Sequence, residues 1–123
     1  MIKKKILIAE DEKPMARALE LKLNNSGFEA KAVNDGEEAV VELTNNKYDL
    51  LLLDLMMPKK DGFGVLEEIN NKKIDVKVII SSNLSQQEDL DKAKNMGAVG
   101  YFVKSDTPIN EVVEQVKKAL NIK

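Results

Sequence analysis

Leu50-Leu51-Leu52-Leu53-Asp54 is the stretch that decides the fold, because four leucines in succession end on a carboxylate. An apolar run of this length is typical of a parallel strand that is buried on both faces of its sheet. We therefore expect this strand to lie at the centre of the sheet. Asp54 then stands at the carboxyl end of the strand, which is where open α/β sheets bind their ligands.

Four further strands are predicted on either side of this run, at residues 5–9, 28–33, 76–81 and 100–103. Helical spacing of apolar residues predicts a helix after each of the five strands. Because strand and helix alternate five times, right-handed crossovers produce an open, doubly wound parallel sheet. The apolar stripes of the helices are expected at Met15, Ala18, Leu19 and Leu23; at Ala39, Val40 and Leu43; at Val65, Leu66 and Ile69; at Leu90, Ala93 and Met96; and at Ile109, Val112, Val113, Val116 and Leu120.

Short motifs mark where these helices begin. Pro14 suits a first helical turn, where its missing N–H costs nothing. Asn34-Asp35-Gly36 is a turn that also supplies the cap of the second helix. Ser85 with Glu88 forms a capping box for the fourth helix, and Thr107-Pro108 is expected to cap and start the fifth.

Length and composition exclude several classes of protein. The 123 residues fit one domain with one core, expected to span 1–123 without an output domain. The net charge of -2 favours neither nucleic acid nor an anionic membrane as a partner. The chain contains no cysteine and no histidine, which excludes disulfides, thiolate or imidazole metal sites and a histidine base. The first apolar run is too short for a signal peptide or a membrane span, so a cytoplasmic protein is expected.

Polar side chains stand at or just past the carboxyl ends of four predicted strands. They are Glu10 and Asp11, Asp54, Ser82 and Lys104. The carboxyl ends of parallel strands meet at one edge of a sheet, so these side chains should converge. Three carboxylates, a hydroxyl and an ammonium are suited to holding a divalent cation and a phosphoryl group.

In this order and spacing, four segments resemble the receiver domain of two-component response regulators across essentially the whole chain. They are ILIAEDE at 6–12, DLLLLDLMMPKKDG at 49–62, IISS at 79–82 and GAVGYFVK at 97–104. The resemblance implies a flavodoxin-like (βα)5 fold whose parallel five-stranded sheet has the order 2-1-3-4-5.

The resemblance also implies a role for each residue of the polar group. Asp54 would be the phosphoacceptor, a carboxylate that acts as a nucleophile. Mg²⁺ would be bound directly by Asp11 and Asp54 and by the backbone carbonyl of Met56, with Glu10 acting through water. Lys104 would contact the phosphoryl oxygens and neutralise charge in the transition state. The family more often has aspartate at the position of Glu10.

Two residues resemble the switch of the family. Ser82 matches the hydroxyl residue that hydrogen-bonds the phosphoryl group and moves inward on activation. Ser81 and Ser85 are nearby alternatives, but the separation from Lys104 favours Ser82. Tyr101 matches the switch aromatic, although packing in the core is an equally open explanation for an aromatic residue in a strand.

Two positions depart from the family pattern near the expected site. Asn83 stands where a small residue is usual, which would narrow access to the phosphoryl group. Ser105 follows Lys104 where proline is typical. Without proline a cis peptide bond costs about 2.5–4 kcal/mol, so this bond is expected to be trans.

The function that the resemblance implies is that of a single-domain receiver in a phosphorelay. A histidine kinase or histidine phosphotransferase would donate the phosphoryl group to Asp54, with Mg²⁺ as cofactor. Phosphorylation would switch the face formed by helix four, strand five and helix five for a downstream protein partner. The protein would catalyse its own phosphorylation and dephosphorylation without being a conventional enzyme. It would be a monomer or a weak phosphorylation-dependent dimer, without direct contact with nucleic acid or membrane.

Two alternatives from other classes remain open. One is a receiver-like interaction module that acts without phosphorylation, although the complete polar set argues against it. The other is a Mg²⁺-dependent phosphatase that acts on small molecules. A chain of 123 residues leaves no cap domain or long loop to enclose such a substrate.

Overall fold

A single parallel sheet organises the chain in a computed structural model that describes residues 3–83 and 87–122. The strand order is β2-β1-β3-β4-β5, which confirms the predicted order. The strands are β1 (Lys5–Ala9), β2 (Glu29–Val33), β3 (Leu50–Asp54), β4 (Lys77–Ser82) and β5 (Gly100–Val103). The helices are α1 (Lys13–Asn25), α2 (Gly36–Asn45), α3 (Gly62–Lys72), α4 (Gln87–Asn95) and α5 (Ile109–Ala119).

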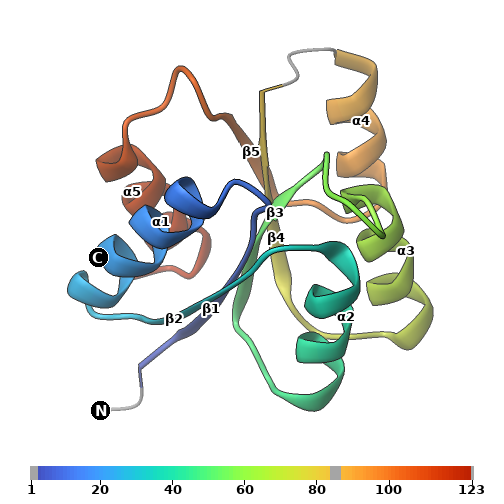
Figure 1. Cartoon of the computed structure of the whole chain (residues 1–123), viewed down its shortest axis with the longest axis horizontal. Coiled ribbons are helices and arrows are strands. Elements are labelled where there is room, and N and C mark those ends of the chain that lie inside the picture. Colours follow the sequence, from blue (N-terminus) through green and yellow to red (C-terminus); the bar gives the residue numbers. More distant parts are fainter. Residues whose placement is uncertain (1–2, 84–86, 123) are drawn as a thin grey trace.

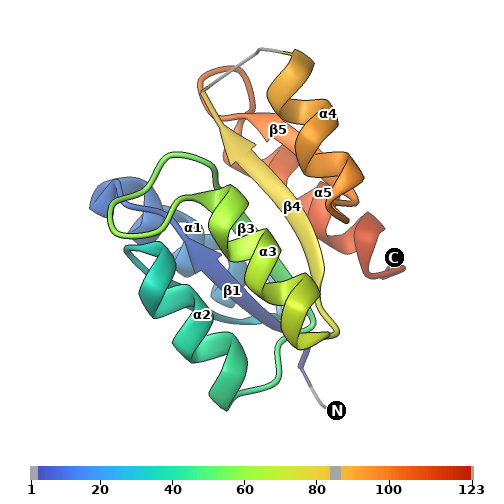
Figure 2. The ribbon, with the colours of Figure 1, turned by 90° about the vertical axis from the view of Figure 1, so that its right-hand side faces the viewer.

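The helices form a layer on each side of the sheet. Helices α1 and α5 cover one face, and α2, α3 and α4 cover the other (Figures 1 and 2). Successive residues of a strand point to opposite faces, so each leucine of β3 joins one of two cores. Leu50 and Leu52 pack with α1 and α5, while Leu51 and Leu53 pack with α2 and α3. The uninterrupted apolar run of β3 is thus explained by burial on both sides.

Three strands differ from their predicted bounds by one residue at an end. Strand β3 includes Asp54, which was expected to follow the four leucines. Phe28 does not belong to β2, because its backbone N–H donates to the Leu23 carbonyl at the end of α1. Strand β4 begins at Lys77, which pairs with the first residue of β3, Leu50. It extends to Ser82 because β5 continues the ladder beyond Asp54 and pairs with Ser82 through Val103.

Helix α1 buries a face slightly rotated from the predicted one. Its buried residues are Ala16, Leu19 and Leu23, and Met15 is only partly buried. Ala18 is exposed, so its assignment to the inner stripe was wrong. One residue is a turn of about 100° on a helix, which carries Ala18 away from the face that Leu19 and Leu23 define.

The helix starts agree only in part with the predicted caps. Asp35 caps α2 as predicted, since its side chain accepts the Glu38 N–H at 2.8 Å. Thr107 does not cap α5: the cap position is Pro108, and no side-chain bond closes it. A Ser85 cap of α4 lies outside the described residues. All peptide bonds of the described residues are trans, so the expectation for the bond after Lys104 is confirmed.

A close approach of backbone segments shapes the loop after β3. A Cβ atom on Gly62 would lie 2.6 Å from the Asp54 carbonyl oxygen, so a side chain there would displace the end of β3. A Cβ atom on Gly36, at the start of α2, would lie even closer to the Lys60 carbonyl oxygen. The loop is therefore held between β3 and α2. Within the described residues, no helix is long and apolar enough to cross a membrane.

Candidate functional site

The polar residues singled out in the sequence lie at the carboxyl ends of the strands, and these ends face the upper half of Figure 1. Glu10 follows β1, Asp54 ends β3, Ser82 ends β4 and Lys104 follows β5. Their convergence follows from parallel pairing, which aligns the ends of neighbouring strands.

The ammonium of Lys104 bridges two buried carboxylates. Its Nζ lies 2.9 Å from Asp54 Oδ2, and 2.6 and 2.8 Å from the two carboxylate oxygens of Glu10. The side chains of Lys104, Asp54 and Glu10 are 6%, 4% and 2% exposed. Charge pairs that are shielded from water in this way attract one another much more strongly than exposed pairs do.

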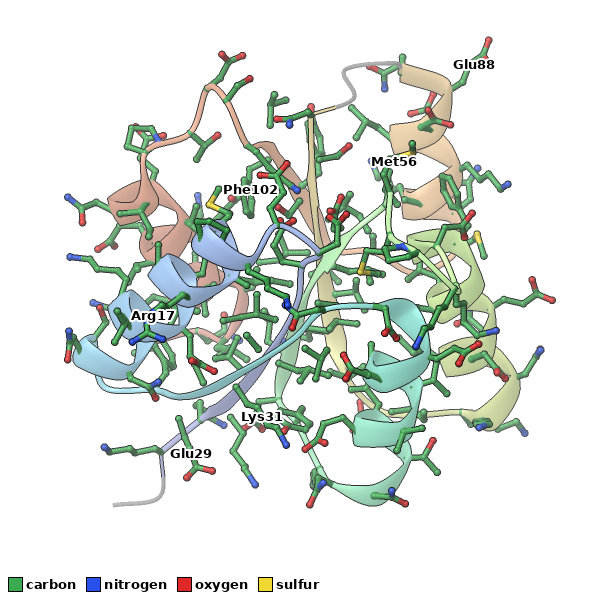
Figure 3. The ribbon with its side chains drawn as sticks, viewed as in Figure 1. Arg17, Glu29, Lys31, Met56, Glu88 and Phe102 are labelled. Carbon is green, nitrogen blue, oxygen red and sulfur yellow. The ribbon has the colours of Figure 1, made fainter. Side chains whose placement is uncertain are left out.

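The two carboxylates are also fixed by backbone donors close to them in the chain. Asp54 Oδ1 accepts the Met56 N–H at 3.2 Å, and Glu10 Oε2 accepts the Glu12 N–H at 3.1 Å. Each carboxylate is therefore oriented by its own loop before any ligand arrives. Figure 3 shows Met56 in the upper half of the molecule beside α4, and the residue is 62% exposed.

Burial, together with the sharing of one positive group by two negative groups, shifts the pKa values here. Burial, reinforced by the charge of Glu10, raises the pKa of Asp54 to about 7, although Lys104 and the Met56 N–H oppose the rise. Burial by itself would lower the pKa of Lys104. The hydrogen bonds and charges of Glu10 and Asp54 outweigh that effect, so the pKa of Lys104 is raised and it stays an ammonium.

The oxygen atoms fit a small divalent cation. Carboxylate oxygens of Glu10, Asp11 and Asp54 all lie within 4.8 Å of one another, and Asp11 is exposed beside the two buried groups. An all-oxygen set with one open side suits Mg²⁺, which keeps several waters. Burial is the main cause of the raised Asp54 pKa and the charge of Glu10 adds to it, and a cation here would compensate that charge.

Glu10 makes a contact that sequence reasoning missed. It was expected to act on the metal through water, whereas in the structure both of its oxygens lie against Lys104. The replacement of the usual aspartate by the longer glutamate was the one available signal, because an extra methylene extends the reach of the carboxylate. The contact leaves a water-mediated role as a prediction.

The two neighbouring serines of β4 occupy different surroundings. Ser82 ends the strand and is 1% exposed. Ser81 pairs in register with Asp54 on one side and Phe102 on the other. Its hydroxyl is buried and has no hydrogen-bond partner among the described residues, a feature that the sequence did not predict. The assignment of the switch hydroxyl to Ser82 stays a prediction.

Tyr101 does not belong to the core. Its side chain is 50% exposed on β5, where it lines a shallow hollow with Leu90, Ala93 and Val99. The neighbouring residue Phe102 faces the other side of the sheet and packs with α1 and α5, as Figure 3 shows. Core packing therefore does not explain the tyrosine, and its role as a switch remains a prediction.

Comparison with known proteins agrees with this geometry. Residues 6–117 match the family model of the response regulator receiver domain. The chain is 38% identical to a probable transcriptional regulator ycf27 of Porphyridium aerugineum, over 97% of this chain and 52% of that protein. It is 32% identical to the alkaline phosphatase synthesis transcriptional regulatory protein PhoP of Bacillus subtilis, over 95% of this chain and 48% of that protein. The chain thus spans about half the length of these curated relatives.

Solved structures share the fold. The receiver domain of the Francisella response regulator 1452 superimposes with a TM-score of 0.89 and 30% identity, covering 96% of this chain and 97% of that one. A CheY-like receiver domain protein of Methanospirillum hungatei has a TM-score of 0.91 at 23% identity, over 98% of this chain and 95% of that one, and this shows the fold alone.

Proposed function

Because the chain belongs to the response regulator receiver family of two-component signal transduction, we propose that it accepts a phosphoryl group on Asp54 from a phosphohistidine of a partner protein. The observation that carries this proposal is the contact of Lys104 Nζ with Asp54 at 2.9 Å, beside a compact group of acidic oxygens. A buried carboxylate that faces both an ammonium and a potential cation site is suited to nucleophilic attack on phosphorus.

The proposed step exchanges one bond to phosphorus for another. A carboxylate oxygen of Asp54 attacks the phosphorus, and the bond from phosphorus to the imidazole nitrogen of the donor breaks. The electron pair of that bond returns to the imidazole, which takes up a proton from its surroundings. Lys104 lies where it can contact the transferred phosphoryl oxygens, and its raised pKa keeps it charged to stabilise them.

The same proposal assigns a cation site. Asp11 and Asp54, the Met56 backbone carbonyl and, through water, Glu10 would hold Mg²⁺, which would offset the charge of the phosphoryl group when bound. Pairing Glu10 with Lys104 limits how much of its charge faces the cation. Asp11 is therefore the carboxylate with the greatest freedom to bind it.

Phosphorylation is proposed to alter the face formed by α4, β5 and α5. Ser82 ends β4 next to the site, and Tyr101 is half exposed on the adjacent strand. Helix α4 is held weakly, since Ala93 is its one buried residue across the described range 87–95. A small inward movement of Ser82 would thus meet little resistance from α4, and a ligand-dependent shift between two arrangements needs only such a small difference in energy.

The partners follow from this chemistry. The chain has no histidine, so the phosphohistidine belongs to a histidine kinase or histidine phosphotransferase, and a cytoplasmic location goes with that exchange. A downstream protein would bind the switched face, with the receiver as a monomer or a weak phosphorylation-dependent dimer. A net charge of -2 supports binding to proteins rather than directly to nucleic acid or membrane.

The test is phosphorylation by a small acyl-phosphate donor, read by intact mass. With Mg²⁺ the parent should gain one phosphoryl group, and chelation of Mg²⁺ should prevent the gain. Asp54→Asn should remain folded and unlabelled, because the nucleophile is gone. Asp49→Asn is the matched control: Asp49 precedes the same strand at its other end, where it accepts the Lys5 N–H at 2.8 Å. This variant should be labelled like the parent.

The outcome separates the alternatives. An unlabelled parent would contradict the proposal and favour an interaction module that acts without phosphorylation. Rapid turnover of many donor molecules, together with hydrolysis of unrelated phosphate esters, would favour a small-molecule phosphatase. Labelling of Asp54→Asn at the parent rate would show that another residue is the acceptor.

A further inference from the structure

The turn between β2 and α2 holds the loop that carries the acidic residues. The Asn34 side chain donates from Nδ2 to the Glu10 carbonyl oxygen at 3.1 Å, across 24 positions of the sequence. The Glu10 N–H donates to the Val33 carbonyl at 3.0 Å. Both backbone polar groups of Glu10 are therefore bound by the last residue of β2 and the residue that follows it.

This contact acts on a particular peptide unit. The Glu10 carbonyl belongs to the planar peptide that joins Glu10 to Asp11. A hydrogen bond to that oxygen sets the rotation of the peptide plane, and thereby the direction in which the Asp11 Cα and side chain leave it. Asp11 is exposed, so surrounding side chains do not enclose it. Its direction depends on the backbone that Asn34 holds.

Asn34 is itself fixed by the start of α2. Its backbone N–H donates to Glu38 Oε2 at 3.0 Å, and the Glu38 N–H donates to Asp35 Oδ1 at 2.8 Å. These bonds close the first turn of the helix, so the amide of Asn34 projects from a rigid base. The side chain of Asn34 is partly buried, which protects its bond to Glu10 from water.

We propose that Asn34 is a positioning residue for Asp11, and that it tunes the site for Mg²⁺ by holding the peptide between Glu10 and Asp11. The inference rests on the proposed function, because it requires a cation at the acidic group. Mg²⁺ demands near-ideal octahedral geometry, whereas Ca²⁺ tolerates irregular and flexible ligands. Loosening the peptide should thus weaken Mg²⁺ binding more than Ca²⁺ binding.

The experiment measures both ions by isothermal titration calorimetry on the unphosphorylated protein. Asn34→Ala and Asn34→Leu both remove the donor without adding charge. We expect the Kd for Mg²⁺ to rise about tenfold, as is usual when a group that orients a metal ligand is removed. The Kd for Ca²⁺ should rise less, so that the preference for Mg²⁺ over Ca²⁺ falls. Thermal unfolding in EDTA reports any loss of stability separately.

Asn24→Ala is the matched control. Asn24 also binds backbone groups of β2, since it accepts the Ala30 N–H at 2.9 Å and donates to the Ala30 carbonyl at 3.2 Å. It lies on the last turn of α1, away from the acidic group. Its removal should lower the melting temperature in EDTA and leave the Kd for Mg²⁺ unchanged.

Four outcomes of these titrations would contradict the proposed role of Asn34. A parent that binds no Mg²⁺ contradicts the proposed function, and this inference with it. A parent that binds Mg²⁺, with Asn34 variants of equal affinity, contradicts this inference alone. So does an equal loss of affinity in Asn24→Ala, or an equal weakening of Mg²⁺ and Ca²⁺. Loss of the fold in both Asn34 variants would show that the residue is structural rather than positioning.

Discussion

Strand β3 and helix α4 differ in how many of their residues are buried. All five residues of β3 are buried, and the strand is paired with β1 on one side and β4 on the other. Helix α4 buries Ala93 alone within its range 87–95, and it contacts α3 through Lys92, whose ammonium lies 4.4 Å from the centre of the Phe63 ring. Asp54, the proposed phosphoacceptor, is the last residue of β3. The proposed acceptor therefore lies on a fully buried central strand, whereas the face proposed to switch includes a helix with little buried surface.

The difference suits the proposed switch. Segments with few buried apolar contacts open at low free energy, while central strands open only with the whole domain. The candidate site draws on both a central and an outer strand of the sheet. Asp54 ends the central strand β3, while Lys104 follows the edge strand β5. Under the proposed function, a charge change at Asp54 would alter α4 and β5 while β3 stays in place.

The largest expected effect is the loss of stability caused by a cavity beside β3. Leu52→Ala should lower the free energy of unfolding by about 2–5 kcal/mol, because Leu52 is 1% exposed and its neighbours cannot close around the void. Leu90→Ala, the same change on α4, should cost clearly less since Leu90 is partly exposed. Urea unfolding measures both. Equal losses would mean that α4 is held as firmly as β3.

The next largest effect concerns Lys104, whose single positive charge is shared by the carboxylates of Glu10 and Asp54. The raised pKa of Asp54, about 7 against an ordinary 3.8, means that the native protein binds this proton more tightly than the unfolded chain. Stability in EDTA should therefore fall as the pH rises between these two values, and then level off. Asp54→Asn removes the titrating group and leaves one carboxylate for one ammonium.

At pH 8 the Asp54→Asn variant should be more stable than the parent by more than about 1.4 kcal/mol, the energy of one pKa unit. The gap should close toward pH 4, where the parent carboxyl is protonated as well. Denaturant unfolding across the pH range measures the two slopes. Parallel slopes for variant and parent would show that Lys104 already compensates both carboxylates.

A smaller effect is expected at the buried hydroxyl of Ser81, which is paired in register with Asp54. Ser81→Ala should raise stability by about 1 kcal/mol, because it removes from β4 a buried hydroxyl that has no hydrogen-bond partner among residues 3–83 and 87–122. Ser26→Ala is the matched control, since the Ser26 hydroxyl donates to the Lys22 carbonyl at 2.7 Å and its loss should not stabilise. A destabilised Ser81→Ala would indicate that the hydroxyl has a partner, such as a bound water.

The smallest expected change in stability concerns α4. Lys92→Met removes the contact with the Phe63 ring, which should cost about 0.5–1 kcal/mol because both groups are near the surface. Hydrogen exchange should become faster in α4 while β3 is unchanged. Lys94→Met, on the same helix but without a ring contact among the described residues, is the control. Faster exchange throughout the domain would contradict an independent α4.

The local sequence pattern predicted most of the strands and helices. It was wrong where contacts with other elements determine a strand end, a buried helix face or a helix cap. The bounds of β1 and β5 were predicted to the residue, because each apolar run ends abruptly at a polar residue or a turn. The end of β4 was missed at Ser82, which is in the ladder only because β5 reaches Val103. Ala18 was placed on the wrong face since alanine fits either one, and Thr107 did not cap α5 although its residue type is favoured there.

The residues at the strand ends, and the chemistry they offer at one edge of the sheet, could be predicted from the order of residues along the chain. An apolar run and the polar residue that closes it are neighbours in the chain, so their relation survives in any parallel sheet. Only the tertiary structure decided which groups meet. Lys104 binds Glu10 across 94 positions, and Asn34 reaches the Glu10 carbonyl across 24. Such contacts depend on side-chain length and strand register to within an ångström or so, as hydrogen bonding requires, and no local pattern carries that information.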